Sequence, residues 1–194
     1  GVGWMLGLLA AVAGVTLPML QGTRAVPTRV LRGWQAGLLL ALGIAIVTWA
    51  QRLPDSAWRG MALPFVVFAA GVLLLQVRSP HQRNPLLRRF WRWGCTALLV
   101  GSALGVWMDN RPLLAGAVLL GIGLPLLVVG MALEITGFLS WITLRQRVAR
   151  GTRVPGVGSL LDEAAKRRVL HAHLLAAAML LAALFAPRFA CVAG

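Results

Sequence analysis

The sequence has few charged residues and very few acids. Charged residues make up 12% of its 194 residues, whereas an average soluble domain has about a quarter, and only five of them are acidic. Tyrosine is absent, Lys166 is the single lysine, and the two cysteines are Cys95 and Cys191. This shortage of charge excludes an ordinary soluble globular domain.

The motifs of several common sites are also missing. The sequence contains no Walker loop, no GxSxG elbow, no HExxH motif and no paired-cysteine metal site. Convergent polar residues are few, so an enzyme embedded in a membrane is the least favoured class. The sequence therefore identifies no catalytic residue.

Long apolar runs take the place of the missing charge. Hydrophobic residues make up 59% of the chain. At about 20 residues for each crossing, six crossings are close to the most that the chain can hold. We predict an all-α, polytopic transmembrane helix bundle in a single domain. Its spans are expected at 4–22, 33–50, 61–77, 91–108, 113–144 and 160–186.

The basic residues are distributed unevenly between these runs. A net charge of +14 on one soluble face would indicate nucleic-acid binding. Instead, 15 of the 19 basic residues lie in the first, third and fifth connections. By the positive-inside rule, those connections are cytoplasmic and both termini are periplasmic in a bacterial inner membrane. The expected partners are the lipid bilayer and its anionic headgroups, with no nucleic acid.

The segment 113–144 is the longest without a basic residue. As one helix it would extend about 48 Å, well beyond a hydrocarbon core of about 30 Å, so it must kink, tilt or protrude. Pro125 is the expected kink, because proline removes a backbone donor and clashes with the preceding turn. Glu134 is an acid deep in this apolar run, and an ionisable group there is a functional-site hypothesis.

His171 and His173 begin the membrane part of the last helix, on the side where Glu134 is expected. A contact between Glu134 and one of these histidines is geometrically reasonable. The alternative is that Glu134 is a neutral or arginine-paired acid in the interfacial zone. Side chains at i and i+2 point about 200° apart on a helix, so both histidines cannot bind one metal. A structural or interfacial role is favoured for them, and a metal-ligand role for one of them is the alternative.

Local patterns make two further predictions. Ser159 is expected to cap the last helix, with Asp162 at capping-box spacing. Pairs of glycines four residues apart let helices approach closely, either within a bundle or between copies. These pairs are Gly33 with Gly37 and Gly101 with Gly105.

Three stretches together resemble a family of uncharacterised proteobacterial inner-membrane proteins of about twice this length. They are VTLPMLQGTRAVP (15–27), GMALEITGFLSWITL (130–144) and VPGVGSLLDE (154–163), in the order in which the family carries them. The chain departs from the family pattern at four positions. The family's glutamine, lysine, proline and histidine correspond here to Val15, Glu134, Gly137 and Thr143.

The resemblance implies that the chain is the C-terminal half of a larger bundle, with upstream helices as further partners. The family is similar in layout to haem-copper oxidase subunit I and NnrS-type membrane proteins, which implies haem or copper as a cofactor by analogy alone. The leading hypothesis is a non-catalytic or redox-associated membrane protein that serves haem, copper or respiratory-chain biogenesis. The alternative is half of a secondary transporter, with Glu134 as its coupling or substrate site.

Overall fold

The computed structural model describes residues 28–51, 54–78, 85–108, 112–149, 152 and 154–185. Every regular element in these ranges is helical, so the all-α prediction is confirmed there. The predicted first span, 4–22, and Cys191 lie outside the described residues.

The described residues form five helical rods. The fourth rod is continuous and contains a π-helical stretch, η1, between two α-helical parts. A 3₁₀ turn, η2, precedes the last rod. The elements are α2 (Thr28–Ala50), α3 (Pro54–Arg78), α4 (Pro85–Trp107), α5 (Pro112–Gly116), η1 (Ala117–Gly123), α6 (Leu124–Arg147), η2 (Val157–Ser159) and α7 (Glu163–Phe185).

Proline is the first residue of three helices: Pro54 in α3, Pro85 in α4 and Pro112 in α5. Proline suits this position because the first helical N–H has no partner within the helix. Two boundaries therefore differ from the predicted spans. Residues 54–60, expected in a turn, belong to α3, and α4 begins six residues before the expected start at 91. Three arginines expected in the third connection, Arg88, Arg89 and Arg92, consequently lie on the first turns of α4.

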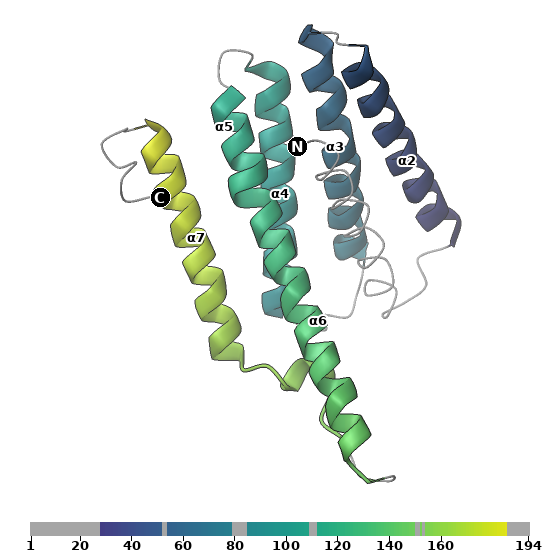
Figure 1. The fold of residues 1–194 in the computed structure, drawn as a ribbon, viewed down its shortest axis with the longest axis vertical. Helices are drawn as coiled ribbons and strands as arrows, with labels where there is room; N and C mark the ends of the chain where they lie inside the picture. Colours follow the sequence, from purple (N-terminus) through teal and green to yellow (C-terminus); the bar gives the residue numbers. More distant parts are fainter. Residues whose placement is uncertain are drawn as a thin grey trace.

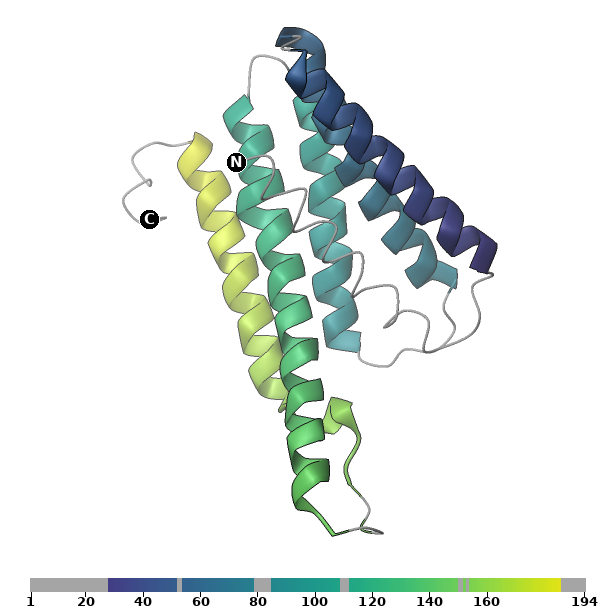
Figure 2. The same ribbon diagram turned by 45° about the vertical axis from the view of Figure 1, so that its right-hand side comes forward.

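Consecutive rods run antiparallel and pack side by side in a row (Figures 1 and 2). α2 packs against α3, α3 against α4, and α4 against the α5–η1–α6 rod. α7 completes the row beside that rod and α4. The starts of α2, α4 and α7 and the ends of α3 and α6 face one side, which is the lower side of Figure 1. We call this side the basic end, because the arginines of these helices gather there.

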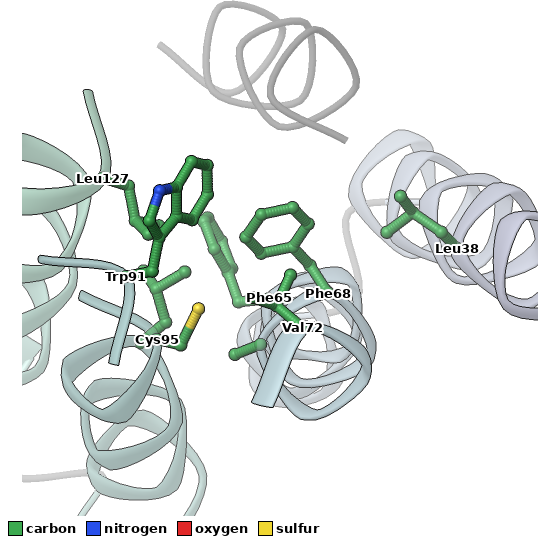
Figure 3. Packing of buried hydrophobic residues seen from close by; sticks show 9 residues of the cluster. Leu38, Phe65, Phe68, Val72, Trp91, Cys95 and Leu127 are labelled. Atoms are coloured by element: carbon green, nitrogen blue, oxygen red, sulfur yellow. The ribbon is translucent and has the colours of Figure 1, made fainter. Parts of the chain in front are cut away.

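The largest buried cluster joins four of the rods. Figure 3 shows Trp91 and Cys95 of α4 facing side chains of α3, with Leu127 of α6 on one flank and Leu38 of α2 on the other. The α3 members shown there are Phe65, Phe68 and Val72. Phe68, Val72 and Cys95 are completely buried. This cluster holds α3 and α4 together at the centre of the row.

Trp34 fastens α2 to α3. Its indole N–H donates to the main-chain oxygen of Val67 at 2.9 Å, and its ring packs on Phe68 with 6.1 Å between centroids. Gly71 makes room for the ring, since a Cβ there would collide with the indole. The polar atom of Trp34 thus bonds a neighbouring helix, as the N–H of a buried indole usually does.

Glycines bring α4 and the long rod into close contact. A Cβ on Gly94 would lie 2.7 Å from the Leu127 side chain and 3.2 Å from the Gly123 oxygen. A Cβ on Gly101 would lie 2.6 Å from the Leu119 side chain. Gly33 has nothing within 4 Å of such an atom. Gly101 therefore serves packing within the row, whereas a side chain added at Gly33 would meet open space.

Candidate functional site

Glu134 lies on α6, where its side chain is partly buried. Gly130, one turn earlier, packs on Phe90 of α4, with 3.0 Å between an added Cβ and the Phe90 Cβ. Because α4 and α6 run antiparallel, Glu134 lies level with the first turn of α4. The acid is therefore near the basic end of the row, as the sequence predicts.

The two histidines have different surroundings, in agreement with their spacing. His171 is exposed, whereas His173 is half-buried and its ring meets Phe90 edge-on at 6.4 Å between centroids. The Nδ1 atom of His173 lies 2.9 Å from the Val169 oxygen. A carbonyl oxygen can only accept, so the proton of the neutral ring lies on Nδ1. These contacts explain His173 as a packed residue of α7.

Glu134 and the histidines lie at different levels of the row. Gly121 lies against Leu180 of α7. Counting along the antiparallel helices from that contact places Glu134 near the level of Arg167, about one turn below His171. The expected contact between Glu134 and a histidine stays a prediction.

The described residues gather no cluster of metal-binding side chains. No group of three His, Cys, Asp or Glu residues that could hold a metal ion occurs among them. His173 offers a single nitrogen beside an aromatic ring, and His171 faces outward. No chemistry that depends on such a group follows from this arrangement.

The long rod changes its hydrogen-bond pattern just before Pro125. Residues 117–123 are π-helical, and the N–H of Leu124 bonds the Leu119 oxygen five residues earlier. Pro125 has no N–H to offer the Gly121 oxygen, which favours this wider turn. π-helical turns often mark functional positions in helices. The kink predicted at Pro125 is thus preceded by a π-helical stretch, and the kink itself stays a prediction.

An open depression of about 470 Å³ follows the lower part of α6. Its lining residues all come from this helix: Thr136, Leu139, Ser140, Thr143, Leu144 and Arg147. The hydroxyls of Thr136 and Thr143 donate to the oxygens of Ala132 and Leu139, at 2.7 and 3.0 Å. Such back-bonding is the ordinary use of threonine in a helix. The depression is therefore one helix face.

Sequence reasoning missed a buried polar contact at the basic end. The Nη2 atom of Arg88 on α4 donates to the main-chain oxygen of Gln76 on α3 at 2.8 Å. Gln76 is only 5% exposed, and neither its Oε1 atom nor the Nε atom of Arg88 has a hydrogen-bond partner. Gln76 is a polar residue near the end of an otherwise apolar run, and such a position could have pointed to a buried polar contact. We call these two residues the Gln76–Arg88 pair.

Lys166 is a buried cation, and the sequence did not predict its burial. It is 2% exposed, and its Nζ atom donates to the Gly158 oxygen at 3.1 Å and to Glu163 Oε1 at 2.8 Å. The lysine thereby joins the η2 turn to the start of α7. Its charge has a carboxylate partner, so its role in the structure is explained.

Exposed arginines surround these polar groups at the basic end. They lie at the start of α2, the start of α4, the end of α6 and the start of α7 (Figure 1). They are Arg29, Arg32, Arg89, Arg92, Arg145, Arg147, Arg167 and Arg168. Arg145 also lies over the Trp141 ring, 5.1 Å from its centroid. The surface at this end can attract anions.

Comparison with protein-family models, with curated proteins and with solved structures finds no match to this chain.

Proposed function

We propose that the chain is a multi-pass protein of a bacterial inner membrane, with six spans and both termini in the periplasm. The observation that carries this proposal is the gathering of arginines at one end of an antiparallel helix row. Such an asymmetry is what the positive-inside rule produces in a membrane protein. Contact of these arginines with anionic headgroups belongs to the same proposal.

Helix length and hydropathy support the membrane. Pro112–Arg147 and Glu163–Phe185 are long and apolar enough to span a bilayer, and shorter apolar stretches lie at Arg32–Thr48 and Ala62–Val77. Only 6% of the apolar stretch of α7 is buried. On α2, the side chains of Leu39 and Leu40 are 68% and 67% exposed. Exposed apolar surface of this extent favours aggregation in water, whereas it is ordinary for a protein surrounded by lipid.

The role that we propose is non-catalytic, within a larger membrane protein that is associated with haem, copper or the respiratory chain. Support for the redox association comes from the resemblance of 15–27, 130–144 and 154–163 to inner-membrane proteins of greater length. The cofactor would have to be held by residues beyond the described ones, since these do not gather a metal site.

Half of a secondary transporter is the second candidate. The π-helical stretch at 117–123 favours it, because transporter sites often use interrupted helices with polar groups nearby. Glu134 would be the coupling or substrate residue. Its place near the basic end weighs against this role, since such sites usually lie near the bilayer midplane.

Substitutions at these residues separate the two candidates. For the leading candidate, purified protein should carry a haem or metal signal that persists in His171→Ala and in His173→Ala, because the ligands of the cofactor would lie beyond the described residues. For the transporter, ion-coupled uptake should be lost in Glu134→Gln and kept in both histidine variants. Full extraction of the protein from membranes by alkaline carbonate would contradict both, because a multi-pass protein stays in the bilayer.

A further inference from the structure

The outward face of α2 carries a row of exposed apolar residues. α2 stands at one edge of the row of helices and packs on α3, with Leu38, Ala41 and Ala45 buried on that side (Figures 1 and 2). On the opposite side, exposed residues follow one another at spacings of four, three and four, which places them on one stripe of the helix. They are Ala36, Leu40, Gly43 and Val47, and we call them the outer stripe of α2.

The outer stripe alternates large and small side chains. Leu40 and Val47 are 67% and 52% exposed, and Ala36 and Gly43 leave gaps beside them. In membrane proteins, small residues at such places let the backbone of a second helix approach closely. Lipid chains can cover any apolar surface and do not require small residues. The pattern therefore favours a helix as the neighbour of this face.

Gly43 lacks the kind of contact that explains other glycines of the row. Glycine is the least favourable residue in a helix interior apart from proline. A Cβ at Gly71 would collide with Trp34, and one at Gly94 would lie 2.7 Å from the Leu127 side chain, so these positions need glycine. A Cβ at Gly43 would meet nothing within 4 Å. The described residues thus give no reason for a glycine on the outward face of α2.

The chain that precedes α2 can supply the neighbour. α2 begins with Thr28 at the basic end, and 27 residues of the sequence come before it. They include the apolar run 4–22, which leaves 23–27 as the connection. Five extended residues reach at most about 18 Å, and packed helices lie about 8–10 Å apart. A membrane-spanning helix formed by this run would therefore end at the basic end, run antiparallel to α2 and lie next to it.

The run and the outer stripe are complementary in this orientation. Counting outward from Ala25, the middle of the connection, brings Gly7 level with Gly43 and Ala11 level with Leu40. Gly7 and Ala11 are four residues apart and so share one face of a helix. Two glycines at the same level allow close approach of the two backbones, and the small side chain of Ala11 leaves room for Leu40.

We propose that the run 4–22 forms a transmembrane helix that packs antiparallel on the outer stripe of α2, with its closest approach at Gly7 and Gly43. The proposal rests on the membrane location proposed above. It adds one helix to the row at the α2 edge. By the same counting, Gly33 is level with the stretch at Pro18, where proline interrupts a regular helix, so the close contact does not extend to Gly33.

The test uses pairs of cysteines in the full chain, in native membranes, with the chain's own cysteines replaced by alanine. With an oxidant that enters the bilayer, Gly7→Cys and Gly43→Cys together should cross-link within most molecules, because a disulfide needs Cα atoms within about 7 Å. The matched control pairs Gly7→Cys with Ile44→Cys, since Ile44 adjoins Gly43 but points about 100° away around the helix. It should cross-link in few molecules. Equal cross-linking of the two pairs would overturn the assignment to the outer stripe.

A second pair leaves the closest contact unchanged. Ala11→Cys with Leu40→Cys should also cross-link within most molecules. The absence of a cross-link in both test pairs, in a protein that alkaline carbonate leaves in the membrane, would overturn the packing and leave lipid as the neighbour of the stripe. Extraction of the protein by carbonate would contradict the membrane location instead.

A single-cysteine variant tests for a second copy of the chain. Gly43→Cys alone should give no cross-linked dimer under the same oxidation, because the run 4–22 covers this position. A dimer formed by most molecules would overturn the run as the neighbour, in favour of the outer stripe of a second copy.

Discussion

At the scale of single residues, the start of α7 shows how a polar side chain completes a helix terminus. The carboxylate oxygens of Asp162 accept from the N–H groups of Ala164 and Ala165, each at 3.2 Å. Asp162 is thus the cap of α7. The expectation that Ser159 caps the helix is wrong, because its hydroxyl donates to the Gly156 oxygen at 2.8 Å within the η2 turn.

Replacing Asp162 should weaken the start of α7. We expect Asp162→Ala to cost about 1 kcal/mol, because two helical N–H groups lose their acceptor. Ser159→Ala should cost less than about 0.5 kcal/mol, since that hydroxyl is exposed and bonds within a turn. Hydrogen exchange of the first turns of α7 measures both effects. A larger loss of protection in Ser159→Ala would contradict the assignment of the cap.

The residue scale also shows what sequence reasoning could reach. Glu134 could be singled out as a candidate because a lone acid in an apolar run is conspicuous. Gln76 and Lys166 could not be singled out in this way, because their contacts depend on which segment packs against them. Gln76 meets Arg88 only when α3 and α4 pair antiparallel, and Lys166 meets Gly158 only when the η2 turn folds back on α7.

At the scale of elements, helix boundaries follow proline and capping more than hydropathy. α3 begins at Pro54 and α4 at Pro85, in both cases before the apolar run starts. Hydropathy assigns the arginines of α4 to the connection before the helix. A helix can nevertheless begin among the headgroups before it enters the lipid. Helices therefore occur at the five predicted runs that the structure describes, and the helical turns before the apolar runs were missed.

Close approach of α4 to the long rod depends on glycine. We expect Gly94→Ala to destabilise the protein by about 1–3 kcal/mol, because its Cβ would lie 2.7 Å from the Leu127 side chain and 3.2 Å from the Gly123 oxygen. Gly33→Ala is the matched control on α2, where an added Cβ meets nothing within 4 Å. It should leave stability unchanged or raise it, because alanine favours the helix. Thermal unfolding in detergent measures both, and equal effects would contradict the packing account.

At the scale of the whole molecule, the order of helices along the chain is also their order in space. Each rod packs mainly on its sequence neighbours, so the row follows from short connections between antiparallel helices. Such an arrangement could be expected from six apolar runs. The sequence could not predict the contacts around Glu134, nor the contact between Gln76 and Arg88. These contacts depend on the register between neighbouring helices.

The central claim is that the basic end of the row lies on the cytoplasmic side. Cys95 is completely buried and so is a poor reporter of sidedness. Gln51 and Gln146 are exposed at opposite ends of the row, and each can be replaced by cysteine in a chain whose own cysteines are alanine. Spheroplasts treated with a membrane-impermeant maleimide then report which side each occupies.

The account predicts that Gln51→Cys is labelled in intact spheroplasts and that Gln146→Cys is labelled only after lysis. Labelling of Gln146→Cys in intact spheroplasts would contradict it.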